Sequence, residues 1–219
     1  MTDTRGQELF IHEAQEKLRE ASGTLATMSK SRLEAFSDGV MAVIITIMVL
    51  EMKVPHGVEA AALATLVPVF LTYVLSFVFV GIYWNNHHHM FQAVHHVRGA
   101  TLWANLHLLF WLSLVPLVTG WMGTNHLASL PTAVYGIVLL GAGCAYYILT
   151  RVLLAGHGQD SPLARAIGRD AKGKVSIVIY AVAIALAFVH PLVSCALYVI
   201  VAGTWLYPDP RFERIFSGK

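Results

Sequence analysis

The sequence predicts an all-α integral membrane protein with six transmembrane helices per subunit, and three observations carry this prediction. Charged residues make up only 13% of the 219 residues and hydrophobic residues 56%, whereas an ordinary soluble domain carries about 25% charged residues. No Asp, Glu, Lys or Arg occurs in residues 60–97, 99–150 or 175–208. The Lys and Arg residues also gather in the segments that are expected to be cytoplasmic, as they do in membrane proteins generally.

The uncharged windows set the spans, because a helix needs roughly 20 apolar residues to cross a bilayer core of about 30 Å. The second span carries Pro68, which we expect to kink the helix. Residues 123–131 supply turn chemistry that divides the middle window, and His190-Pro191 divides the last one, which would be roughly 51 Å long as a single helix. The six expected spans are about 33–54, 60–83, 100–122, 131–154, 174–189 and 191–207.

The positive-inside rule tests this count independently. With six spans and a cytoplasmic N-terminus, 14 of the 15 Lys and Arg residues fall in cytoplasmic segments, and only Lys53 falls outside. A five-span chain would give 11 against 4. We therefore expect both termini in the cytoplasm, an N-terminal segment 1–30, a transmembrane domain 31–208 and a C-terminal tail 209–219.

The N-terminal segment is polar, but part of it carries an apolar stripe at helical spacing. The residues of this stripe are Leu9, Phe10, Ala14, Leu18 and Ala21. The pattern allows a helix that lies on the membrane, a helix that packs against a neighbour, or a loosely ordered tail.

The first span is unusual because Asp38 and Glu51 leave only twelve uncharged residues between them. At about 100° per residue, Ile47 lies about 40° and Leu50 about −20° from Val43, whereas Asp38 lies at about −140°. One face is thus an aliphatic column, with Thr46 at its edge. The other face carries an acid that needs partners from neighbouring helices. An aliphatic column on its own is typical of ordinary packing.

The string RLEAFSDGV at 32–40, followed by MAVIITIMVLEMKVP, resembles the signature of the endolysosomal potassium channel family in its bacterial branch. That signature is Arg, three residues, then Phe-Ser-Asp-Gly at the start of a membrane helix. The resemblance implies a potassium-selective channel that is a homotetramer of six-helix subunits, with the first helices around a central pore. It implies no re-entrant filter, and the chain has no TVGYG-like string.

The resemblance also implies roles for residues of the first span. Val43 corresponds to the hydrophobic constriction, Ile47 and Leu50 to the next pore-facing layers, and Thr46 to a layer linked to selectivity. Rings of these aliphatic side chains would make a narrow neck that gates by drying. Glu51 either forms an acidic ring at the outer mouth or ends the helix in solvent, paired with Lys53.

The same resemblance places Arg32, Ser37 and Asp38 in a polar network that ties the first helix to the second and third. Candidate partners share the expected depth of Asp38, near the cytoplasmic ends of those helices. They are Asn85, Asn86, His87, His88, His89, Trp103, Asn105 and His107. Which of them bond to Asp38 cannot be chosen from the sequence.

The sequence predicts no cofactor and no metal, although it has 11 histidines. The adjacent His87, His88 and His89 would point about 100° apart on a helix, and no HExxH motif occurs. No nucleophile elbow or phosphate loop occurs either, so we expect no enzyme. The expected partners are potassium ions, the bilayer and other copies of the chain, without nucleic acid, in the plasma membrane. The alternative is a secondary or proton-coupled carrier that uses Asp38 as a proton relay.

Overall fold

The fold is described from a computed structural model that covers residues 4–55, 57–158, 161, 163–164 and 171–206. In α1 (Thr4–Leu50), side chains are described for residues 11–17 and 30–50. The predicted C-terminal tail, 209–219, lies outside the described residues. The other helices are α2 (Ala60–Ala64), α3 (Val67–Gln92), α4 (Gly99–Ser113), α5 (Val115–Thr124), α6 (Ser129–His157), α8 (Ala171–Leu186) and α9 (Pro191–Leu206).

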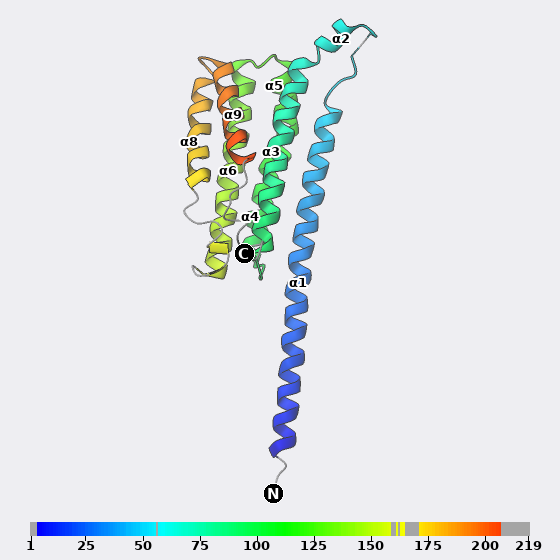
Figure 1. Cartoon of the computed structure of the whole chain (residues 1–219), viewed down its shortest axis with the longest axis vertical. Helices are drawn as coiled ribbons and strands as arrows, with labels where there is room; N and C mark the ends of the chain where they lie inside the picture. Colours follow the sequence, from blue (N-terminus) through cyan, green and yellow to red (C-terminus); the bar gives the residue numbers. More distant parts are fainter. Residues whose placement is uncertain (1–3, 56, 159–160, 162, 165–170, 207–219) are drawn as a thin grey trace.

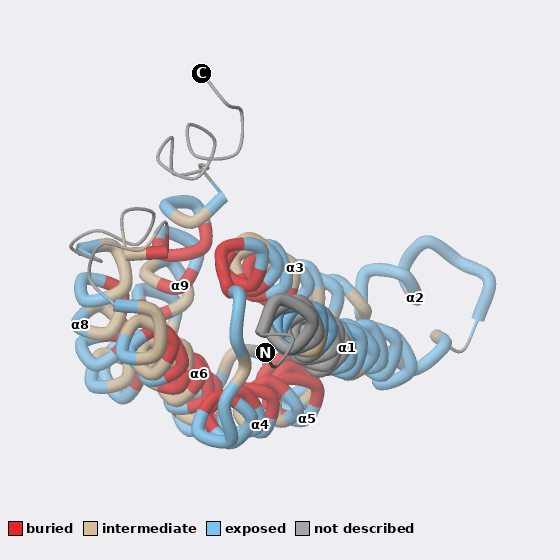
Figure 2. The backbone as a smooth tube through the Cα atoms, turned by 90° about the horizontal axis from the view of Figure 1, so that it is seen from below, coloured by how far each residue is buried: buried red, intermediate tan, exposed pale blue. Residues whose placement is uncertain are grey.

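The helices stand side by side in one bundle, and successive long helices run in alternating directions (Figure 1). Helix α1 packs on α3, α4 and α5 at one side, while α8 and α9 pack on α6 at the other. The view along the bundle shows buried backbone facing inward from α3, α4, α5 and α6 (Figure 2). The N-terminal half of α1 projects well beyond the bundle (Figure 1).

Four stretches of the described helices are long and apolar enough to cross a membrane, which confirms the prediction of an all-helical membrane protein. They are Lys30–Leu50, Val67–Gln92, Gly99–Thr124 and Ser129–His157. Helices α8 and α9 have 16 residues each, which corresponds to about 24 Å at 1.5 Å per residue. Their length alone does not establish a fifth and a sixth span.

The predicted bounds of the second span were wrong. We expected about 60–83 with a kink at Pro68, but α3 runs from Val67 to Gln92 and Pro68 lies in its first turn. A proline fits there, because the N–H that it lacks has no partner within the helix at that position. Residues 60–64 form the separate short helix α2. The shift brings Trp84 and the histidines 87–89 inside the helix, within its last three turns.

The two predicted turns are confirmed. Helix α5 ends at Thr124 and α6 begins at Ser129. The linker includes His126 and Leu127 with φ of 50° and 60°. Helix α8 ends at Leu186 and α9 begins at Pro191, so these two helices form a hairpin. Ser194 Oγ closes the hairpin by donating a hydrogen bond to the Ala183 carbonyl oxygen at 2.7 Å.

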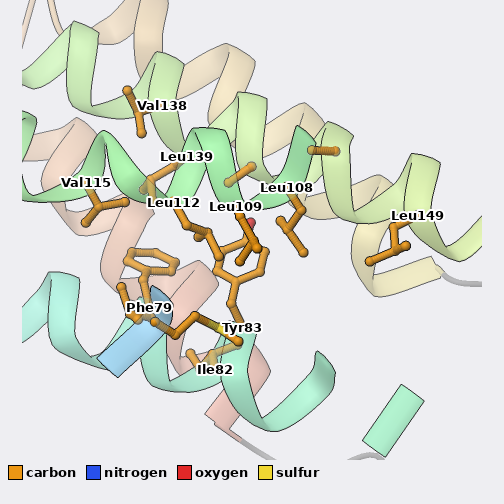
Figure 3. Close-up of a cluster of buried hydrophobic side chains, with 14 of the residues drawn as sticks. Phe79, Ile82, Tyr83, Leu108, Leu109, Leu112, Val115, Val138, Leu139 and Leu149 are labelled. Atoms are coloured by element: carbon orange, nitrogen blue, oxygen red, sulfur yellow. The ribbon is translucent and has the colours of Figure 1, made fainter. Parts of the chain in front are cut away.

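The core between α3, α4 and α6 is a continuous apolar cluster that includes Phe79, Leu108, Leu112 and Leu139 (Figure 3). Lipid tails are as apolar as these side chains, so burial from lipid gives little driving force, and close packing with interhelical hydrogen bonds has to hold the helices together. The Ser76 hydroxyl makes two such hydrogen bonds, since it lies 2.6 Å from Thr119 Oγ1 and 3.0 Å from the Tyr135 hydroxyl. It joins α3, α5 and α6.

Gly123 of α5 lies close against α3. A Cβ atom at this position would lie 2.8 Å from Val69 Cα, a backbone atom that cannot rotate away. We expect Gly123→Ala to destabilise the subunit by about 1–3 kcal/mol, as overpacking of a tight contact does. Thermal unfolding in detergent would measure the change. Gly203→Ala in α9 is the control, because its added methyl group meets no atom within 4 Å. Equal unfolding temperatures for the two variants would contradict the prediction.

Candidate functional site

Helix α1 turns two different faces to its surroundings between Leu33 and Leu50. The face against α3, α4 and α5 is buried and consists of Leu33, Ser37, Met41, Ile44 and Met48. Another face, about 110° around the helix at 100° per residue, carries Val43, Ile47 and Leu50, which are 54%, 41% and 80% exposed. The column that the sequence predicted is therefore exposed in the single subunit. Much of α1 is coloured as exposed residues in Figure 2.

This uncovered face borders an open groove of about 740 Å³. From α1 the groove is lined by Val43, Ile47 and Glu51, among others, and from the α4–α5 segment by Ser113, Pro116 and Leu117. The walls are mainly apolar, with the Ser113 hydroxyl and the Glu51 carboxylate as polar groups. An apolar groove of this kind, on a subunit that crosses a membrane, offers a surface to lipid, to another subunit or to an enclosed path.

Thr46 lies at the edge of the uncovered column and is exposed. Its hydroxyl donates a hydrogen bond to the Val43 carbonyl oxygen of its own helix at 2.9 Å. Because the proton is used in this bond, the lone pairs of the hydroxyl oxygen remain available outward. Such an oxygen can accept a hydrogen bond or face a cation.

Ser37 is the centre of a buried hydrogen-bonded chain through three helices. Its hydroxyl donates to the Leu33 carbonyl oxygen at 2.9 Å and accepts from Asn105 Nδ2 of α4 at 2.9 Å. The Asn105 side-chain oxygen lies 2.8 Å from His87 Nε2 of α3, and this pairing requires the Nε2-protonated form of the ring. All three side chains are at most 2% exposed.

Asp38 is held separately, by a residue that the sequence did not nominate. Trp84 of α3 donates its indole N–H to Asp38 Oδ1 at 3.0 Å. The Trp84 ring stacks on His88, with ring centroids 6.0 Å apart, and His88 Nε2 lies 2.8 Å from Gln92 Nε2. The Asp38 carboxylate thus accepts a hydrogen bond from the neighbouring helix, and its donor, Trp84, is itself stacked on His88.

The structure places the other predicted network residues apart from this chain of bonds. Arg32 is exposed, and Trp103 is 75% exposed. His107 accepts from Trp111 Nε1 within α4 at 3.1 Å, and Asn86 donates to the Ile82 carbonyl oxygen within α3. Asn85 is exposed and His89 is partly buried. Of the candidate partners, His87 and Asn105 are hydrogen-bonded toward Ser37.

Glu51 follows directly after the last residue of α1 and is exposed. Its carboxylate is turned toward α5, since a Cβ atom built on Gly120 would lie 3.7 Å from Glu51 Oε2. Lys53, the alternative partner expected from the sequence, is also exposed. The acid therefore stands at one end of the uncovered column, on the groove described above.

The histidines are spread over several contacts. His157 at the end of α6 accepts hydrogen bonds from the backbone N–H groups of His95 and His96 at 3.1 and 3.3 Å. Within the described residues, no group of three or more His, Cys, Asp or Glu side chains is placed to hold a metal ion.

Comparison with known proteins relates the chain to ion channels. The sequence model of the family described as "Endosomal/lysosomal potassium channel TMEM175" matches residues 32–116. A potassium channel of Chryseobacterium sp. (strain P1-3) is 54% identical over 187 residues, which cover 85% of this chain and 97% of the relative. A potassium channel of Streptomyces collinus is 34% identical over 78% of this chain and 88% of its own.

A solved structure agrees with these sequence matches. The crystal structure of a lysosomal potassium-selective channel TMEM175 homolog from Chamaesiphon minutus superposes with a TM-score of 0.71 at 29% identity. The superposition covers 82% of this chain and 97% of that one.

The apolar bundle, its candidate spans and the uncovered column on α1 define an integral membrane protein. The Chryseobacterium relative is matched over nearly its whole length, and the family match includes the uncovered part of α1. The chain belongs to the TMEM175 family.

Proposed function

We propose that this protein is a potassium-selective channel in which ions cross the membrane passively along the first helices of four identical subunits. The uncovered column of Val43, Ile47 and Leu50 is the observation that carries this proposal. Its position in the family match and the naming of the matched relatives as potassium channels add support. Each subunit contributes one α1 to a central axis and packs through the neighbouring exposed surface.

The column forms a hydrophobic neck in this arrangement. Four copies of Val43, Ile47 and Leu50 stack three apolar rings along the axis, at about 1.5 Å of rise per residue. A narrow apolar neck expels water, so ions stop when it is closed and pass when it widens enough to be wetted. The exposure of these side chains in the single subunit leaves them free for this role.

Thr46 supplies the polar layer of the path. Four Thr46 hydroxyl oxygens, each with its proton bound to the Val43 carbonyl oxygen, direct lone pairs toward a passing cation and replace part of its hydration shell. Four Glu51 carboxylates at the other end of the column form an acidic ring that raises the local cation concentration. This ring is the outer mouth of the channel.

The buried chain of Ser37, Asn105 and His87 fixes the rotation of α1, together with the contact between Asp38 and Trp84. A rotation of α1 by 100° would replace the neck residues by their neighbours, so the path depends on these bonds. Arg32 lies five residues before Ser37, on the cytoplasmic side of the neck, and is exposed. The residues of the buried chain and of the contact between Asp38 and Trp84 are positioning residues, since none of them lines the neck.

The expected setting is the plasma membrane, with six spans and both termini in the cytoplasm. The alternating helices and the distribution of Lys and Arg support this topology. Helices α8 and α9 are short for spans, and a bilayer can thin locally to accommodate such helices at a modest cost.

A flux measurement on reconstituted protein tests the function. Liposomes loaded with potassium and diluted into sodium should lose potassium through the protein, as reported by a pH-sensitive dye in the presence of a protonophore. Valinomycin gives the maximal signal, and protein-free liposomes give the background. We expect loss of potassium without any second solute, and a smaller rate when the internal cation is sodium.

The same assay distinguishes the channel from a carrier. A secondary transporter that uses Asp38 as a proton relay would require a proton gradient or a second solute, and its rate would saturate with potassium concentration. Either of these results would contradict the proposed channel.

A further inference from the structure

The N-terminal part of α1 is a helical extension that the proposed channel does not use. Helix α1 is uninterrupted from Thr4 to Leu50, yet the family match begins at residue 32. The extension of residues 4–30 is about 40 Å long at 1.5 Å per residue. It continues the direction of the membrane part of α1 away from the bundle (Figure 1). A helix in this direction cannot lie flat on the membrane.

The extension carries apolar residues at alternating spacings of three and four, which is the heptad pattern of a coiled coil. They are Ile11, Ala14, Leu18, Ala21, Leu25 and Met28. At about 100° per residue, all six positions fall within about 60° of Val43 on the helix. The stripe of the extension and the neck column therefore share one face of α1, across some forty residues of continuous helix.

Charged residues avoid this face. From Glu13 to Lys30, the charged residues lie on the half of the helix opposite the stripe, except Lys17, which lies at the edge of the stripe. These charges are Glu13, Glu16, Arg19, Glu20 and Lys30. The residues directly after Ala14, Ala21 and Met28 are Gln15, Ser22 and Ser29, and all three are uncharged. Around a symmetry axis each charge would meet its own copy, so an uncharged inner face is what self-association requires.

No described helix of the subunit covers the projecting part of α1 (Figure 1). Among the stripe residues whose side chains are described, Ile11 is 55% exposed and Ala14 is partly buried. An isolated helix with Gly23 in its middle has little stability of its own in water. A helix that leaves the membrane into water with an apolar stripe gains stability by covering that stripe.

We propose that residues 11–28 of four copies of this chain form a parallel, in-register coiled coil on the axis of the channel. This proposal rests on the tetramer of the proposed function. The membrane part holds the four helices at a local concentration of order millimolar or above, so a coil of less than three heptads suffices. Arg32 lies on the same face of α1 and interrupts the stripe, and the coil therefore ends at Met28.

Thiol crosslinking in the full-length protein tests the coil. In a background in which Cys144 and Cys195 are replaced by serine, Leu25→Cys should be joined into dimers by oxidation or by a short bifunctional thiol reagent, because its copies are neighbours. Glu20→Cys, on the outer face of the helix, is the matched control and should remain monomeric on denaturing gels. Val43→Cys reports on the neck in the same background.

The outcomes separate the coil from the channel. Crosslinking of Leu25→Cys and Val43→Cys without Glu20→Cys supports the coil. Crosslinking of Val43→Cys alone overturns the coil and leaves the tetramer intact. Crosslinking of neither overturns both. Equal rates for Leu25→Cys and Glu20→Cys overturn the coil, because they reflect random collision of the helices.

A stability measurement provides a second reading. The double variant Leu18→Asn, Leu25→Asn should lower the temperature at which the detergent-solubilised tetramer dissociates. The double variant Arg19→Asn, Glu20→Asn alters the outer face of the same turns and should leave that temperature unchanged. A tetramer that is equally stable in both variants overturns the proposed coil.

Discussion

Asn105→Leu is expected to weaken the attachment of α1 to the rest of its subunit, because the side-chain amide links the Ser37 hydroxyl to the His87 ring. Leucine has the same branched shape and the same number of side-chain heavy atoms but neither donates nor accepts, so the buried His87 ring loses its partner, and Ser37 keeps only its bond to the Leu33 carbonyl oxygen. A buried unsatisfied group costs about 1–3 kcal/mol, although interhelical bonds in membrane proteins often contribute less. We expect a loss of about 1–3 kcal/mol in unfolding free energy and a lower dissociation temperature of the tetramer.

The control for this variant is Asn85→Leu, the same chemical change at an exposed position of α3. A double-mutant cycle with Ser37→Ala then isolates the bond itself, because residues in contact show coupling energies of about 0.5–3 kcal/mol. If the tetramers of the Asn105→Leu and Asn85→Leu variants dissociated at the same temperature, or if the cycle gave no coupling energy, the proposed role of the hydrogen bond between Asn105 and Ser37 would be wrong.

The windows without charge placed the helices of this protein well where one window had to hold two spans and the turn between them. Charges are costly in the bilayer core, so residues 99–150 and 175–208 had to hold spans and turns, and the turns were readable from their Gly, Asn and Pro residues. Residues 60–97 are longer than one span needs. Hydropathy cannot decide which part of such a window is helical, and Pro68 was placed in the middle of a helix that it actually begins.

The faces of α1 were predictable from periodicity, but the partners of its polar residues were not. The angle between Asp38 and Val43 follows from 100° per residue, whereas a contact with α3 depends on the relative depth and rotation of two helices. Trp84 was missed because a hydropathy pattern treats its ring as one more apolar surface and does not register the indole N–H that Asp38 accepts from.

The neck makes the second prediction with a large expected effect. Ile47→Ala removes four apolar side chains from one ring and widens the neck, so water and ions enter at a lower free-energy cost. If the barrier falls by about 1.4 kcal/mol, the ion flux rises about tenfold, and we expect an increase of this order in potassium flux, with weaker discrimination against sodium. The fold should tolerate the change, because Ile47 is 41% exposed in the subunit and fills no part of its core.

Ile45→Ala is the matched control, two residues away on the same helix. Ile45 packs against the hydrophobic core rather than standing in the uncovered column. The two variants should therefore divide their effects, because Ile45→Ala removes core packing and leaves the ring intact, whereas Ile47→Ala does the reverse. We expect lower thermal stability with near-normal flux for Ile45→Ala, and raised flux with near-normal stability for Ile47→Ala. Raised flux in both variants, or in neither, would mean that the constriction of this channel lies elsewhere than on the uncovered face of α1.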